Sequence, residues 1–131
     1  MSKSYKSLFV FILILIAALA SACADQRPAP APEAAIDPRI EQGKTIYTQN
    51  CASCHATSPE TVIVGPSLHN IATISETRVD GQDAKTYLEL SIMEPGDHVV
   101  EGYNDIMPST FGKSLSGEDF DALIAYLLSL K

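Results

Sequence analysis

The sequence predicts an all-α domain over residues 37–131 of a 131-residue chain. Two observations support this fold class. Apolar residues recur every three or four positions after a helix start at residue 37, and again after a helix start at residue 116. In addition, no stretch shows the alternating strands and helices of a β-α-β unit. Residues 1–36 differ in composition and form separate segments.

The first 22 residues have the parts of a secretory signal peptide. Lys3 and Lys6 precede an apolar run from Leu8 to Ala20, and small residues end the segment at Ala22. A membrane-spanning helix needs roughly 20 apolar residues, and this run is shorter. Residues 1–22 are therefore expected to direct export.

Cys23 follows the signal directly. The stretch Leu19–Cys23 is similar to a bacterial lipoprotein processing site, at which Cys23 becomes a lipidated N-terminus. Leu19 lies one position early for that pattern, so ordinary cleavage after Ala22 and an uncleaved helix are the alternatives. An exported chain with an unpaired, unmodified thiol is chemically awkward, which favours the lipid anchor. Because alternating Pro and Ala favours extended polyproline II, residues 23–36 are expected to form a tether.

The first helix of the domain is expected to begin at Asp37-Pro38 and to run into Cys51. Asp caps free backbone N–H groups, and Pro suits the first helical position. One face of this helix carries Ile36, Ile40, Gly43 and Tyr47. Glycine inside a helix costs about 1 kcal/mol relative to alanine, and the usual compensation is the close approach of another backbone.

The last helix is the expected partner at Gly43. Ser116 and Asp119 resemble a capping box at its start. Its apolar stripe consists of Phe120, Leu123, Ile124, Leu127 and Leu130. The two helices are expected to cross at Gly43, with Leu123 or Tyr126 filling the space beside the glycine.

The most specific motif is the pentad from Cys51 to His55, with Cys54 between them. C-x-x-C-H is the attachment signature of c-type haem, in which each thiol adds across one haem vinyl group. The imidazole that follows is then directed at the iron. A thioredoxin-like pair needs a β-α-β unit and a zinc site needs a second ligand pair, and the sequence has neither. The pentad therefore predicts one covalently bound haem c.

Four motifs follow one another along the domain: Gly43-x-x-x-Tyr47-x-x-x-Cys51-x-x-Cys54-His55, Gly65-Pro66-x-Leu68, Met107-Pro108 and Leu123-Ile124-Ala125-Tyr126-Leu127. In order and spacing they resemble the class I, mono-haem cytochromes c. The resemblance implies crossed N- and C-terminal helices, loops wrapped around the haem, and a middle helix over Ala84–Met93 that ends at Glu94-Pro95-Gly96. Residues 91–130 are also similar to the haem domains associated with bacterial terminal oxidases and respiratory complexes.

The resemblance implies that His55 and Met107 are the iron ligands and that the Pro66 carbonyl accepts a hydrogen bond from the other His55 ring nitrogen. Met107 lies in a loop held by a proline, whereas Met93 ends a helix, where methionine usually fills the core. Met93 and His98 remain alternatives for the sixth ligand. The residues expected to line the distal pocket are Tyr87, Tyr103, Asn104 and Phe111.

These features predict an electron carrier rather than an enzyme, lipid-anchored at the outer face of a bacterial cytoplasmic membrane. Its expected partners are a quinol-oxidising complex and a terminal oxidase or photosynthetic reaction centre, with no nucleic acid and no small-molecule substrate. One alternative is a permanently bound subunit of a respiratory complex. Another is a haem sensor or peroxidase-like enzyme with an open sixth position.

The net charge of the predicted domain bears on which proteins it can bind. Residues 37–131 carry six basic and fourteen acidic side chains, a formal balance of −8. Four of the acids precede Met107: Glu94, Asp97, Glu101 and Asp105. Mitochondrial members of this family have a lysine-rich face there, so their partners do not carry over. The acids serve solubility, or they receive a basic patch of the partner.

Overall fold

The computed structural model describes residues 37–131, which belong to one compact unit. The expected signal peptide (1–22), Cys23 and the tether (23–36) lie outside the described residues. The helices are α2 (Pro38–Asn50), α3 (Ile71–Ser75), α4 (Ala84–Met93), α5 (Phe111–Ser114) and α6 (Gly117–Ser129). Residues 37–131 contain no strand, only an isolated bridge between His55 and Val62. The all-α prediction is confirmed.

Within residues 37–131, none of the helices has the length and apolar character needed to cross a bilayer.

The two long helices start at the predicted caps. The Asp37 carboxylate accepts a hydrogen bond from the backbone N–H of Arg39 at 3.0 Å, which starts α2. The Ser116 hydroxyl accepts from the backbone N–H of Asp119 at 3.1 Å and donates to the Asp119 carboxylate at 2.8 Å, which starts α6. In both cases a side-chain oxygen satisfies a backbone donor that the helix itself leaves free.

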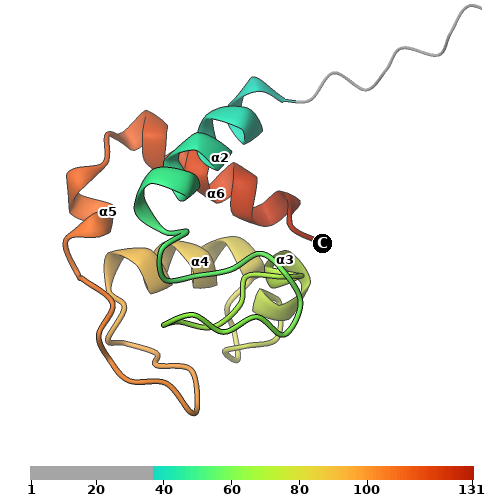
Figure 1. Cartoon of the computed structure of the whole chain (residues 1–131), viewed down its shortest axis with the longest axis vertical. Helices are drawn as coiled ribbons and strands as arrows, with labels where there is room; N and C mark the ends of the chain where they lie inside the picture. Colours follow the sequence, from blue (N-terminus) through green and yellow to red (C-terminus); the bar gives the residue numbers. More distant parts are fainter. Residues whose placement is uncertain (1–36) are drawn as a thin grey trace, which may run out of the picture. The chain divides into compact units, whose positions relative to one another are not determined.

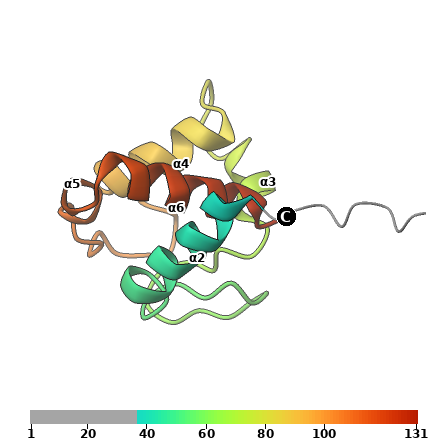
Figure 2. The same cartoon turned by 90° about the horizontal axis from the view of Figure 1, so that it is seen from above.

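Helices α2 and α6 cross at Gly43, as expected (Figure 1, Figure 2). A Cβ atom at Gly43 would overlap the carbonyl of Ala122 and would lie 2.7 Å from the Cβ of Tyr126. The Tyr126 ring packs against the Tyr47 ring, with the two ring centroids 5.4 Å apart. Of the two candidates for the space beside Gly43, Tyr126 fills it. Leu123 instead lines a cavity.

Helix α4 spans Ala84–Met93 and is capped by Asp83, whose carboxylate accepts from the backbone N–H of Thr86 at 2.7 Å. It packs against α6 and α3, and its buried face includes Tyr87, Leu88 and Ile92. The middle helix implied by the family resemblance therefore has the expected bounds.

The sequence patterns do not predict α3 and α5, which are too short to show helical periodicity. Tertiary contacts hold both. The backbone N–H of Ala72 in α3 donates to the carbonyl of Leu130 at 3.1 Å. In α5, a Cβ atom at Gly112 would overlap the sulfur of Met93, so α5 packs closely on the last turn of α4. The contact between Gly112 and Met93 therefore fixes the two ends of the α4–α5 loop next to each other.

We expect Gly43→Ala to lower the free energy of unfolding of the haem-loaded protein by about 1–3 kcal/mol, the usual cost of overpacking. The new methyl group would meet the backbone of α6, and the gain in helix propensity of about 1 kcal/mol offsets only part of that cost. Urea unfolding followed by circular dichroism measures the difference.

Gly117→Ala in α6 is the matched control, because no atom lies within 4 Å of a Cβ at that position. This variant should be as stable as the natural protein or slightly more stable. Equal stability of the two variants would contradict the close crossing at Gly43.

Candidate functional site

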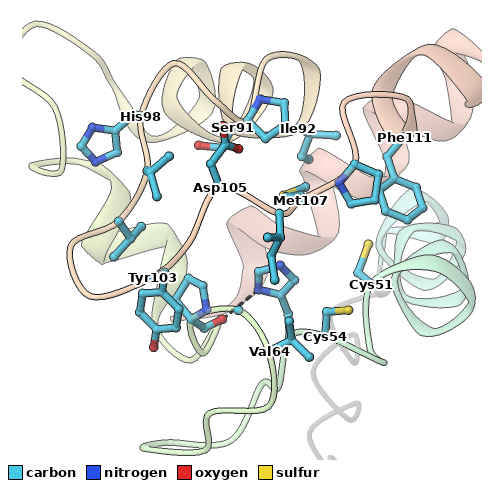
Figure 3. A pocket seen from close by; sticks show the side chains of 18 of the residues that line it. Cys51, Cys54, Val64, Ser91, Ile92, His98, Tyr103, Asp105, Met107 and Phe111 are labelled. Atoms are coloured by element: carbon cyan, nitrogen blue, oxygen red, sulfur yellow. Dashed lines mark hydrogen bonds between the residues drawn. The ribbon is translucent and has the colours of Figure 1, made fainter.

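A cavity lies between the turn that follows α2, helix α4, and the loop that joins α4 to α5 (Figure 3). The empty space within its lining, including the part open to solvent, is about 1090 Å³. Most of the lining side chains are apolar, among them Val64, Ile92, Val99, Phe111, Leu115 and Leu123.

The C-x-x-C-H pentad continues directly from α2 in tight turns. The backbone N–H groups of Cys54 and His55 both donate to the carbonyl of Cys51, at 3.0 and 2.9 Å. All three residues line the cavity, and the two cysteines are free thiols. Burial raises the pKa of the Cys51 thiol. A redox-active C-x-x-C pair instead lowers the pKa of its attacking thiol, so the environment of Cys51 argues against that chemistry.

The His55 ring is fixed by one hydrogen bond. Its Nδ1 lies 2.8 Å from the carbonyl oxygen of Pro66 (dashed line in Figure 3). Because a carbonyl oxygen only accepts, Nδ1 is the donor, and in the neutral imidazole this leaves the lone pair of Nε2 free. This is the tautomer that an iron ligand requires, oriented by a hydrogen bond to its other ring nitrogen.

Two further residues, Gly65 and Tyr47, keep His55 of the pentad in position. The sequence analysis assigned neither of them this role. A Cβ atom at Gly65 would overlap the His55 ring, so only glycine permits this backbone to pass so close to the imidazole. The Tyr47 hydroxyl donates to the carbonyl oxygen of His55 at 2.5 Å. Burial raises the pKa of Tyr47, which keeps the phenol protonated and able to donate. No spacing in the sequence indicates these contacts.

The candidates for the sixth ligand lie in different places. Met107 lines the cavity together with His55, on the loop between α4 and α5. Met93 is not among the lining residues, and its sulfur packs against Gly112. His98 lines the end of the cavity remote from Cys51 and Cys54 (Figure 3). The four residues expected around the distal pocket all line the cavity: Tyr87, Tyr103, Asn104 and Phe111.

These residues fit a covalently attached haem. Two free thiols meet at one edge of an apolar cavity, an imidazole presents an unprotonated nitrogen, and a thioether lies in the same lining. Cys51 and Cys54 would hold the macrocycle, while His55 and Met107 would complete the coordination of the iron. When bound, the haem supplies reversible one-electron chemistry.

Comparison with known proteins gives the family. The family model for cytochrome c matches residues 40–131, which include the pentad, the cavity lining and α6. No curated protein matches the chain. Since the match covers well over half of the sequence, the chain belongs to the cytochrome c family, the electron-transfer proteins that bind haem c covalently.

Proposed function

We propose that this cytochrome is a mono-haem electron carrier at the outer face of a bacterial cytoplasmic membrane. It would take single electrons from a quinol-oxidising complex and pass them to a terminal oxidase or a photosynthetic reaction centre. The observation that carries the proposal is that Met107 shares one cavity with His55 and the two cysteines. A thioether and an imidazole together close the coordination of the iron and raise its potential, as a carrier requires.

The loop that bears Met107 is restrained, which favours a permanent ligand. Phe111 begins α5 four residues after Met107, and its ring lines the cavity. Lys113 of α5 pairs with Glu94, at the end of α4, at 3.6 Å, and so links the two ends of the loop. A methionine held in this way would stay on the iron, whereas a haem sensor or peroxidase-like enzyme needs an open sixth position.

We therefore expect Met107→Ala to open the sixth position. The ferrous variant should bind carbon monoxide, and its midpoint potential should fall, because the thioether that favours the ferrous state is gone. Visible and near-infrared spectra and a carbon monoxide titration measure the change.

Met93→Leu is the matched control and should keep the native spectrum, with a packing cost below about 1.5 kcal/mol. A native spectrum in Met107→Ala would refute the assignment of Met107. Carbon monoxide binding by the natural protein would instead favour a sensor or a peroxidase-like enzyme.

The proposed location rests on the first 36 residues of the sequence. Residues 1–22 have the features of a signal peptide, and Cys23 follows them. We propose that Cys23 is lipidated and that residues 23–36 tether the haem domain. At about 3.1 Å per residue, the dozen positions from 25 to 36 span roughly 35 Å in polyproline II.

Cys23→Ala is expected to move the haem-loaded protein from the membrane fraction to the soluble periplasmic fraction, because Ala20 and Ala22 still permit ordinary cleavage. Ser21→Ala should leave the protein with the membrane. Haem absorbance and immunoblots of the two fractions measure the distribution. A natural protein that is already soluble would rule out the anchor.

Two segments that each contribute a residue to the cavity lining, Val64 and Ile106, carry unlike exposed side chains. Next to Val64 in the chain, Val62 and Ile63 are 61 % and 50 % exposed. This segment, residues 62–64, runs beside the pentad, since the N–H of Val64 donates to the carbonyl of Cys54 at 3.1 Å. Ile106, 63 % exposed, follows a stretch with exposed acids at 97, 101 and 105.

We propose that the partner presents an apolar surface to residues 62–64 and basic side chains to the acidic loop, residues 94–105. Opposite charges steer the encounter and are screened over about 10 Å at 0.1 M salt, whereas apolar contact is not weakened by salt. The two kinds of contact should therefore separate in a salt titration.

Electron transfer to terminal oxidase in host membranes that lack the native cytochrome, followed as oxygen uptake, provides the test. Glu101→Lys should slow it about three- to tenfold at low salt, with the difference disappearing at high salt. Glu41→Lys, in the first turn of α2, is the charge-matched control and should change little. Ile63→Ser should slow the reaction at every salt concentration. Rates indifferent to salt, with retention in a complex in mild detergent at high salt, would favour the permanently bound subunit.

A further inference from the structure

The hydrogen bond that orients His55 depends on the position of one carbonyl group, that of Pro66. The carbonyl oxygen lies 2.8 Å from His55 Nδ1 (Figure 3). Proline has no backbone N–H, so Pro66 cannot hold its own place by donating a hydrogen bond. The position of this carbonyl is therefore set by the residues on either side of Pro66.

Backbone hydrogen bonds hold the chain on both sides of Pro66. Before it, the N–H of Gly65 donates to the carbonyl of Cys54 at 2.9 Å. Beyond it, the N–H of Leu68 donates to the carbonyl of Ala56 at 2.7 Å. Residues 64–68 are thereby laid against the end of the pentad and the residue that follows it.

The Ser67 hydroxyl adds side-chain hydrogen bonds directly after Pro66. It donates to the carbonyl oxygen of Ser58 at 2.7 Å and accepts from the backbone N–H of His69 at 3.1 Å. The carbonyl oxygen of Ala56 is farther away, at 3.4 Å. Because a hydroxyl has only one proton to donate, the shorter bond to Ser58 is the favoured one.

The contact between Ser58 and Ser67 closes the base of a loop, residues 58–67. The tip of this loop carries the exposed side chains of Val62 and Ile63, which belong to the segment proposed to meet the partner. Since the loop is closed next to Pro66, a displacement of the tip need not move the Pro66 carbonyl. The hydroxyl of Ser67 thus lies between the docking segment and the hydrogen bond to His55.

We propose that Ser67 is a positioning residue for the iron ligand: its hydroxyl holds the Pro66 carbonyl against His55 Nδ1. A hydrogen bond from this nitrogen raises the basicity of the ligating imidazole. A more basic ligand favours ferric iron, so Ser67 lowers the midpoint potential. This inference rests on the proposed role of His55 in a one-electron carrier.

The test compares Ser67→Val with Ser67→Thr in the haem-loaded protein, because the two side chains have nearly the same shape and only threonine has a hydroxyl. In the ferrous protein, the His55 Nδ1–H should exchange with heavy water at least about tenfold faster in Ser67→Val, as followed by NMR. The reduction equilibrium should shift about threefold toward the ferrous state, which raises the midpoint potential by about 28 mV. Ser67→Thr should stay close to the natural protein in both measurements.

Ser129→Ala is the matched control. It removes a hydroxyl bond of similar length, from Ser129 to the carbonyl of Tyr126 at 2.6 Å, in the last turn of α6. Ser129 does not line the haem cavity. The exchange at His55 and the midpoint potential should therefore keep their natural values in this variant.

The proposal is overturned if either the exchange or the potential of Ser67→Val equals that of Ser67→Thr. An equal change in Ser129→Ala would also overturn it, because general loss of stability would then be the cause. Failure of the carrier role is seen separately, as carbon monoxide binding by the natural protein.

A measurement on the natural protein decides the matter if Ser67→Val does not load haem. One closed segment protects both the Nδ1–H of His55 and the backbone N–H of Leu68, so the two protons should exchange with the same free energy of opening. A much lower free energy of opening at His55 would show that this segment does not hold the carbonyl, and would overturn the proposal.

Discussion

The backbone contact between Gly43 and Ala122 is the constraint on which the site depends. It allows α2 and α6 to cross without a side chain between them, and this brings Tyr47 against Tyr126, with ring centroids 5.4 Å apart. The Tyr47 hydroxyl then reaches the carbonyl of His55 at 2.5 Å. The helix crossing and the proposed iron ligand are therefore joined by a single side chain, so the geometry of the ligand follows from the packing of the helices.

The two faces of the haem site are built by different means. The proximal face uses local backbone contacts, because residues 64–66 run against the pentad and place the Pro66 carbonyl 2.8 Å from His55 Nδ1. The distal face uses a long loop held at its ends by the packing of Gly112 on Met93 and by the pairing of Lys113 with Glu94. The proximal face is therefore set by short-range hydrogen bonds, and the position of Met107 by the contact between α4 and α5.

Electrostatics separates this chain from the basic mitochondrial members of its family. Asp105 lines the cavity, three further acids lie in the same segment at 94, 97 and 101, and no Lys or Arg of the described residues lines the cavity. Charge of this sign would favour a partner that presents basic side chains, which is the basis of the proposed docking.

The sequence by itself determined the helix starts and the haem-attachment motif, because these depend only on residues close together in the chain. Asp37 and Ser116 cap helices because their side chains reach backbone N–H groups two or three residues away, and the pentad needs only its own spacing to attach haem. The sequence did not reveal α3 and α5, the reason for Gly65, or the bond from Tyr47 to His55. Each of these depends on a contact between segments that the chain pattern does not bring together: the end of α6 with α3, Met93 with α5, and the imidazole with a glycine ten residues later. Periodicity and capping record what a residue does within its own helix, and only the tertiary structure decides which backbone lies against it.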